Sequence, residues 1–291
     1  MKVLLAGASG MIGRAVESEL RTQGCQTRSL TRSPGGDYLW DARPGSVPAE
    51  ALEWADALVS LNGASLTHLP WTASYRDQIR ASRVDAATAL AQAIAASDDP
   101  PRVWVSGSAI GVYGDCGDAD VDESSPAGVG FLAQVVRDWE QATSPAQEAA
   151  RVVLARTGIV LGKDGALKPL ALATRLGLGS RVGPGTQWWP WISLPDEARA
   201  ICFALVTPEL AGPVNLVGPV PATSETISRA LARAMRRPHI FTLPSPLIRT
   251  VMSGADELLL SSQKAHPTVL LKAGFTFQYA EAAEAIDALW D

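Results

Sequence analysis

Met1-Lys-Val-Leu-Leu-Ala-Gly7-Ala-Ser9-Gly10-Met-Ile-Gly13 is the segment that decides the fold. Residues 3–6 form an apolar run that is too short for a helix, and this run predicts a strand buried on both faces. Residues 14–23 carry apolar side chains at helical spacing, which predicts a helix. The three glycines therefore lie where a strand turns into a helix.

That position gives each glycine a physical role. Gly7 permits a tight turn out of the strand, Gly10 has no side chain to keep a pyrophosphate away from the backbone, and Gly13 lets the helix pack close to the sheet. The first N–H groups of the helix then face the phosphates. A plain glycine-rich turn is the alternative, but the order strand, glycines, helix favours a dinucleotide site.

Length and composition are those of an ordinary globular protein. The chain has 291 residues, of which 47% are hydrophobic and 19% charged, and its net charge is −5. There is no basic run, so a nucleic-acid partner is not expected. No apolar stretch approaches the ~20 residues of a membrane span, and the first strand begins where a signal peptide would lie. We therefore expect a cytoplasmic monomer or homodimer that acts on a small-molecule substrate and does not bind a membrane.

The residue types that bind metals are scattered along the chain. No two of the three cysteines form a Cys-x-x-Cys pair, and scattered cysteines of this kind are typical of reduced thiols in the cytosol. The three histidines lie far apart in the sequence and show no ligand spacing, so no metal site is expected.

Strands and helices alternate over the first half of the chain. Beyond the opening unit, the predicted strands are residues 26–30, 38–41, 57–61, 102–106 and 151–156, and the predicted long helices are residues 72–96 and 131–148. This order predicts an α/β fold with a Rossmann-like, doubly wound parallel sheet. The alternation fades after residue 163. We therefore expect a nucleotide-binding domain at 1–162 and a smaller, mixed, closely packed substrate-side region at 163–291.

The residues after the second predicted strand bear on the choice of cofactor. This strand ends about 20 residues beyond the glycines, where NAD-binding folds place an acid on the ribose. Arg32 and Ser33 stand there instead, and no acid occurs before Asp37. A guanidinium can bind a 2′-phosphate through two hydrogen bonds, whereas a carboxylate would repel it. The pattern favours NADP(H) over NAD(H), with a solvated surface arginine as the alternative.

Further cofactor contacts are expected where other strands end. Asp41 follows the third strand, where it either closes the adenine pocket or is a simple turn residue. Small residues at 62–64 follow the fourth strand and can pass beneath the phosphates or ribose. The residues that we assign to the cofactor are Gly7, Ser9, Gly10, Met11, Ile12, Gly13, Arg32, Ser33, Asp41, Asn62, Gly63, Ala64, Ser106, Thr157 and Gly158.

Motifs along nearly the whole chain resemble one protein family. They are Gly7-Ala-Ser-Gly-Met-Ile-Gly13, Leu30-Thr-Arg32, Asn62-Gly-Ala64, Ile79-Arg-Ala-Ser82-Arg83, Ser108-Ala-Ile-Gly-Val-Tyr-Gly-Asp115, Phe131-Leu-Ala, Arg137-Asp-Trp-Glu140, Arg156-Thr-Gly158, Gln187-Trp188, Gly212-Pro-Val-Asn-Leu216 and Asp256-Glu-Leu-Leu-Leu260. Together they resemble the SulA-like, nucleoside-diphosphate-sugar epimerase-related family of atypical short-chain dehydrogenases. The resemblance implies an extended Rossmann-like fold, NADP(H) binding and a family-specific C-terminal region.

Two positions depart from the pattern of that family. Where the family resemblance implies His-Ile-Asp-Asp, this chain has Ser193-Leu-Pro-Asp196. An acidic residue that usually precedes Phe-Leu-Ala is Gly130 here. If those groups perform chemistry in relatives, this chain has lost or changed that chemistry.

The usual acid/base pair of extended reductases and epimerases is absent. Those enzymes use a tyrosine and a lysine four residues later, because an unaided phenol with a pKa of about 10 is a poor base at neutral pH. Phe131 and Val135 stand at the expected positions. We instead assign catalysis to Ser108 and Tyr113, which follow the strand at 102–106; the alternative is that both hydroxyls only order their loop.

Two functions of different classes remain open from the sequence. The first is an NADP(H)-dependent oxidoreductase or epimerase-like enzyme acting on a small or nucleotide-linked substrate, with reduction favoured because it needs only a proton donor. The second is a non-catalytic NADP(H) sensor. The helix at 72–96 also carries Arg76, Arg80 and Arg83 on one face. These arginines either bind a substrate phosphate or, as we favour, form a solvated helix face.

Overall fold

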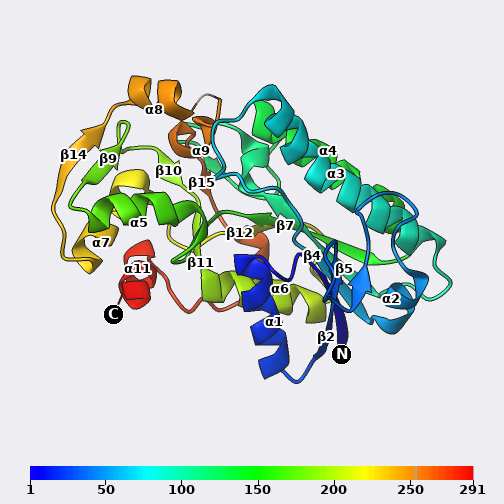
Figure 1. The fold of residues 1–291 in the computed structure, drawn as a ribbon. Coiled ribbons are helices and arrows are strands. Elements are labelled where there is room, and N and C mark those ends of the chain that lie inside the picture. Colours follow the sequence, from blue (N-terminus) through cyan, green and yellow to red (C-terminus); the bar gives the residue numbers. More distant parts are fainter. Residues whose placement is uncertain (253, 291) are drawn as a thin grey trace.

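A parallel sheet of seven strands forms the centre of the molecule (Figure 1), as the computed structural model of residues 1–252 and 254–290 shows. Its order is β12-β7-β5-β4-β1-β2-β3, and every neighbouring pair is parallel. The strands are β1 (Lys2–Ala6), β2 (Gln26–Thr31), β3 (Tyr38–Leu39), β4 (Ala57–Ser60), β5 (Val103–Ala109), β7 (Arg151–Thr157) and β12 (Gly212–Leu216). The predicted doubly wound parallel sheet is confirmed.

The strand β1 is buried on both faces because successive side chains enter different layers. Val3 and Leu5 pack with helix α1 (Met11–Thr22) and helix α6 (Leu194–Val206), whereas Leu4 and Ala6 pack toward helix α3 (Ala73–Ala96). Figure 1 shows α1 and α6 on one side of the sheet and α3 with α4 (Phe131–Gln141) on the other. All of these helices flank strands whose carboxyl ends carry the predicted site.

A smaller group of elements lies beside the edge of the sheet that β12 forms. In Figure 1 it includes β9, β14, α5, α7 and α11. The remaining elements of the chain are α2 (Ala49–Trp54), β6 (Asp120–Val121), β8 (Ile159–Leu161), α5 (Lys168–Arg175), β9 (Gly179–Val182), β10 (Trp188–Trp189), β11 (Trp191–Ser193), β13 (Ala222–Thr223), α7 (Ser224–Ala234), β14 (His239–Leu243), α8 (Ser245–Met252), α9 (Glu257–Leu260), β15 (Lys264–Ala265), α10 (Thr268–Lys272) and α11 (Ala282–Trp290), with short 3-10 turns η1 (Ile110–Tyr113), η2 (Ser144–Ala146) and η3 (Gly165–Leu167).

Residues beyond 162 also contribute to the nucleotide-binding layers. The strand β12 pairs with β7, and α6 packs against α1. The predicted boundary at 162/163 stays a prediction, and these two elements lie on its far side. In the residues that the structure describes, no helix combines the length and apolarity needed to cross a membrane.

Candidate active site

At Gly7 and Gly13 of the opening turn a side chain would collide with neighbouring backbone, whereas at Gly10 there is room for one. Gly7 has φ of 90°, and a Cβ there would lie 2.9 Å from the carbonyl group of Leu61. At Gly13, a Cβ would lie 2.2 Å from the oxygen of Gly7. Gly10 has an ordinary φ of −71°, and its nearest neighbour would be that same oxygen at 3.4 Å. The fold therefore explains Gly7 and Gly13, while Gly10 leaves an approach to the backbone.

The N-terminus of α1 is available to an anion. Gly10 provides no side-chain cap, and the first turn contains no acidic residue. The free N–H groups and the positive end of the helix dipole favour a bound phosphate. Ser9 is exposed beside this turn, Met11 lies against Gly162, and Ile12 packs into the core.

The loop after β2 presents Arg32 and Ser33 to solvent. Asp37, the nearest acid along the chain, accepts hydrogen bonds from the backbone N–H and the hydroxyl of Ser29 at 2.8 and 2.9 Å. These bonds, the backbone one first, hold the pKa of Asp37 below its usual value. Asp41 accepts from the N–H of Arg43 at 3.0 Å, which is a local turn contact.

The loop after β4 lies between the glycine turn and helix α3. The side-chain oxygen Oδ1 of Asn62 is buried and has no hydrogen-bond partner within residues 1–252 and 254–290. Ala64 donates its N–H to Ser82 Oγ at 2.9 Å and accepts from Arg83 at 3.2 Å. An orphaned buried acceptor in a loop that α3 holds in place is consistent with a ligand that supplies the missing donor.

A hydrogen-bond network that the sequence did not predict lies behind Ser108. This residue belongs to β5 and pairs in register with Arg156 of β7. Its hydroxyl donates to Glu140 Oε1 at 2.5 Å. Arg156 donates two hydrogen bonds to the same carboxylate, at 2.8 and 2.9 Å. Hydrogen bonds and the charge of Glu140 raise the pKa of Arg156 despite the opposing effect of burial.

Tyr113 is enclosed by the same network. Its side chain is 2% exposed, and its hydroxyl donates to Asn215 Oδ1 and accepts from Arg156 Nη1, both at 2.9 Å. Burial raises the pKa of Tyr113 against the lowering effect of Arg156. This geometry favours a role in holding Arg156 over direct contact with a substrate. Ser106, two residues before Ser108 on β5, is also fully buried.

The end of β7 faces a buried acid on α6. Thr157 donates its hydroxyl to Glu197 Oε1 at 2.7 Å, and the other carboxylate oxygen has no partner in the described part of the chain. Burial raises the pKa of Glu197 to about 8. Gly158 is needed for packing, since a Cβ would lie 2.1 Å from the oxygen of Pro190.

Apolar side chains fill the region where a tyrosine–lysine pair is usual. The ring of Phe131 packs edge-on against Trp71, with centroids 5.9 Å apart. Val135 is buried against Ile79 in the same cluster. Neither position offers a proton donor.

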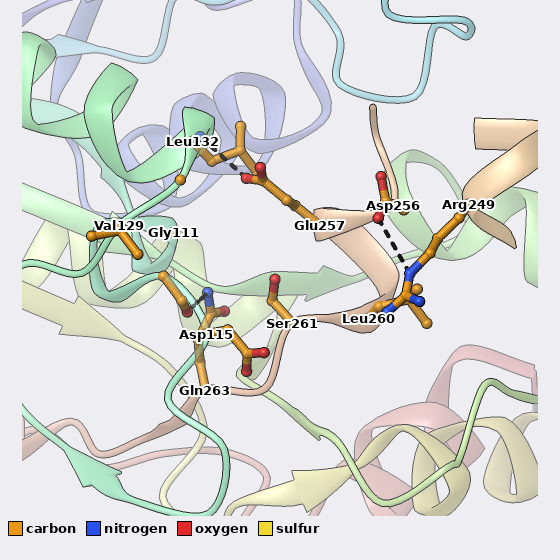
Figure 2. A pocket seen from close by; sticks show the side chains of 12 residues that line it. Gly111, Asp115, Val129, Leu132, Arg249, Asp256, Glu257, Leu260, Ser261 and Gln263 are labelled. Atoms are coloured by element: carbon orange, nitrogen blue, oxygen red, sulfur yellow. Dashed lines mark hydrogen bonds and ion pairs between the residues drawn. The ribbon is translucent and has the colours of Figure 1, made fainter. Parts of the chain in front are cut away.

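A cavity of about 260 Å³ lies beside the first turn of α4 (Figure 2). Asp115, Gly130, Arg249, Glu257 and Gln263 contribute to its wall. Figure 2 shows Glu257 pointing at the backbone of Leu132. This position at the carboxyl ends of the strands is where an open α/β sheet binds its ligand.

Glu257 lies beside Gly130, one of the two departures from the family pattern. Its carboxylate accepts from the N–H groups of Phe131 and Leu132, at 3.4 and 3.3 Å, and so caps α4. A Cβ at Gly130 would lie 3.3 Å from this carboxylate. Glu257 therefore places an acid from α9 beside Gly130. The other departure, Ser193, caps α6 by accepting from the N–H of Asp196 at 3.1 Å.

Comparison with known families identifies two matching segments. Residues 3–218 match the NAD dependent epimerase/dehydratase family. Residues 243–289, which include α9 and the capping Glu257, match a domain of unknown function, DUF1731.

Individual relatives match over almost the full chain. An epimerase family protein of Mycobacterium bovis, Mb2239, is 41% identical over 98% of this chain and 96% of its own length. The crystal structure of human epimerase family protein SDR39U1 with NADPH superposes with a TM-score of 0.91 at 30% identity, covering 99% of both chains. The UDP-glucose 4-epimerase of Thermus thermophilus, solved with NAD, shares the fold at 16% identity and a TM-score of 0.75, covering 100% of this chain and 99% of its own.

Proposed function

Because the chain belongs to the NAD dependent epimerase/dehydratase family, we propose that it is an NADP(H)-dependent oxidoreductase that reduces a carbonyl group of a small or nucleotide-linked substrate. The observation that carries this proposal is the open, uncapped N-terminus of α1 at Gly10, beside the orphaned Asn62 Oδ1. The NADPH in the human relative supports the same cofactor here.

The residues present fit such a dinucleotide. In our proposal the backbone from Gly7 to Gly13 holds the pyrophosphate, and Asn62 bonds a hydroxyl or amide donor of the ligand. Arg32 and Ser33 hold the 2′-phosphate, and the ends of β5 and β7 face the reacting ring. Asp37 does not oppose this assignment, because its carboxylate is engaged by Ser29.

Replacing Arg32 with alanine is expected to remove most of the preference for NADPH over NADH. Wild type should bind NADPH at least tenfold more tightly, which is about 1.4 kcal/mol and within reach of one charge-assisted phosphate contact. Fluorescence titration of both cofactors measures this gap. Arg21→Ala, which removes another exposed arginine that pairs with Glu17, is the control and should keep the preference. Equal affinity of wild type for the two cofactors would overturn the assignment.

Ser108 is the group that we propose to contact the reacting oxygen of the substrate. In this scheme a bound dinucleotide would supply the hydride to the carbonyl carbon, the Ser108 hydroxyl would give its proton to the carbonyl oxygen, and Ser108 would regain a proton from solvent water. Glu140 and Arg156 hold the Ser108 hydroxyl in one orientation through the bond to the carboxylate. When that hydroxyl turns to the substrate oxygen, the ion pair between Glu140 and Arg156 keeps both partners satisfied. Tyr113, which the sequence suggested as a catalytic group, acts in this scheme as a positioning residue, because its buried hydroxyl accepts from Arg156 and donates to Asn215.

Ser108→Ala and Tyr113→Phe are each expected to slow carbonyl reduction while leaving NADPH affinity nearly unchanged. Loss of a positioned proton donor costs roughly 10²–10⁴ in rate. The measurement is NADPH oxidation with a panel of carbonyl compounds, followed by the variants on any active compound. Ser144→Ala, at an exposed serine on η2, is the matched control. A reductase activity that neither variant alters would move the proton donor to another group, such as Asp115.

A non-catalytic NADP(H) sensor is the second candidate function. The apolar cluster of Phe131, Val135 and Trp71 at the usual acid/base position favours it. Tight NADPH binding with no oxidation by any compound in the same panel would support the sensor. The cytoplasmic location and a monomeric or homodimeric state stay predictions under either function.

A further inference from the structure

The cavity in Figure 2 has one wall from early in the chain and one from residues 243–289, which we call the DUF1731 segment. The early wall runs from η1 to the first turn of α4 and follows β5, the strand that carries Ser108. The late wall consists of Arg249, Asp256, Glu257, Leu260, Ser261 and Gln263. A segment with no assigned role therefore closes the cavity beside the proposed catalytic serine.

Hydrogen bonds hold the late wall against the early one. Ser262 donates its N–H to Asp115 Oδ1 at 3.0 Å and its hydroxyl to the oxygen of Gly117 at 2.5 Å. Gln263 donates its side-chain amide to the oxygen of Gly114 at 2.8 Å. The strand β15, which comes next, pairs with β6 in parallel. These contacts fix the chain from α9 to β15 as a built part of the cavity.

Two features of the cavity would attract an anion, and an acid at the start of α9 occupies each of them. The first turn of α4 presents backbone N–H groups and the positive end of a helix dipole. Glu257 already accepts from two of these groups, those of Phe131 and Leu132. The second feature is the guanidinium of Arg249, whose Nε lies 4.0 Å from Asp256 Oδ2 (Figure 2). The DUF1731 segment thus neutralises both anion sites.

The charge and the size of the cavity point to the same class of ligand. Asp115 adds a third carboxylate, and within residues 1–252 and 254–290 Arg249 is the only cationic side chain in the wall. Like charges disfavour a bound phosphate, whereas carboxylates accept hydrogen bonds from hydroxyl and ammonium groups. The volume of about 260 Å³ is below the ~300–1,000 Å³ of pockets for drug-sized ligands. The cavity therefore suits a small ligand that is rich in hydrogen-bond donors.

We propose that the DUF1731 segment selects the substrate, which is a small carbonyl compound that carries hydroxyl or ammonium groups and no phosphate or carboxylate. The inference rests on the proposed function for the identity of this ligand as a substrate, and it excludes nucleotide-linked compounds. Asp256 and Glu257 are specificity-determining residues in this assignment, because they occupy the two anion sites. Asp115 and Glu257 also accept from the donors of the ligand, since a carboxylate has about four acceptor positions.

The first test compares matched pairs of compounds in NADPH oxidation: glyceraldehyde with glyceraldehyde 3-phosphate, and erythrose with erythrose 4-phosphate. Wild type should prefer the unphosphorylated member of each pair by about tenfold or more in kcat/KM. Hydroxyacetone and aminoacetone should both react faster than butanone, which has no donor, and the faster of the two identifies the preferred donor. Added salt should shrink the preference within each phosphate pair, because it screens charge repulsion. A wild type that prefers the phosphate esters would overturn the inference.

Glu257→Gln and Asp256→Asn each remove one negative charge and keep the shape of the side chain. An amide oxygen can still accept from the N–H groups of Phe131 and Leu132, so α4 should stay capped. Each variant frees an anion site and should raise kcat/KM for the phosphate esters, relative to their parent compounds, by about tenfold. Glu281→Gln is the control, because this exposed acid of the same segment lies outside the wall of the cavity. If Glu257→Gln does not fold, Asp256→Asn still decides.

Binding of unreactive probes separates this inference from the proposed function. Ligand-observed NMR compares erythritol with erythritol 4-phosphate on protein saturated with NADPH. If no carbonyl compound is reduced, but wild type prefers erythritol and Glu257→Gln weakens that preference, the reductase function falls and the selecting role of the segment stands. If carbonyl compounds are reduced, but Glu257→Gln and Asp256→Asn both keep the wild-type selection, the inference alone falls.

Discussion

A Gly10→Val variant is expected to fold like wild type and to lose NADPH binding by about 100-fold or more, equivalent to about 2.7 kcal/mol. The backbone at this position is extended, with φ of −71° and ψ of 165°, which a β-branched residue adopts readily. Among residues 1–252 and 254–290, and leaving aside the two adjacent residues, the only atom within 4 Å of the new Cβ is one carbonyl oxygen at 3.4 Å. The branched side chain would instead fill the approach that a pyrophosphate needs.

Gly13→Ala provides the contrast for this prediction. Its Cβ would meet the oxygen of Gly7 at 2.2 Å, so the turn itself must move and stability should fall by about 1–3 kcal/mol. Circular dichroism and thermal unfolding report the fold, and fluorescence titration reports binding. A Gly10→Val protein with wild-type NADPH affinity would show that the phosphates lie elsewhere.

Glu197 is expected to make the protein less stable as pH rises from about 5 to 8. The folded state holds this carboxyl protonated, with a pKa of about 8, whereas the unfolded chain ionises it near 4.5. Between these values the folded state binds one more proton, so the free energy of unfolding falls by about 1.4 kcal/mol per pH unit. The effect is fully developed above pH 8 and absent below the unfolded pKa.

Glu197→Gln isolates this contribution. The amide keeps the oxygen that accepts from Thr157 and has no proton to lose. Relative to this variant, wild type should lose about 3–4 kcal/mol of unfolding free energy between pH 5 and pH 8. Denaturant unfolding of both proteins across that range measures the difference. Parallel pH profiles would mean that the carboxyl is solvated in the folded state.

Local sequence patterns predict most of the central sheet. Short apolar runs mark β1, β4, β5 and β7, because strands that are buried on both faces carry apolar side chains at successive positions. The strand β5 is longer than predicted and ends at Ala109 rather than Ser106. Glycine and serine weaken the strand pattern there, so the sequence predicts a loop for the last three residues of this strand.

The interactions at the site could not be predicted in the same way. Glu140 and Arg156 stand in motifs that the family resemblance picked out, but their pairing depends on α4 lying across β7. Glu257 reaches Phe131 from 126 positions away along the chain. Arg83 looks like one of three equivalent helix arginines until the loop after β4 is placed against it. Such contacts follow from tertiary packing, and sequence spacing carries no trace of them.

The late position of β12 in the chain has a consequence for synthesis on the ribosome. Domains generally fold as units, N-terminal part first, as the chain emerges. Here β7 lacks its outer neighbour until residue 216 has left the exit tunnel, and α1 lacks its partner α6 until residue 206 has done so. During synthesis, one edge of the nascent sheet and one apolar face of α1 therefore stay uncovered until more than forty residues beyond position 162 have emerged. Chaperones bind uncovered strand edges and apolar faces of this kind, and nascent chains can aggregate through them.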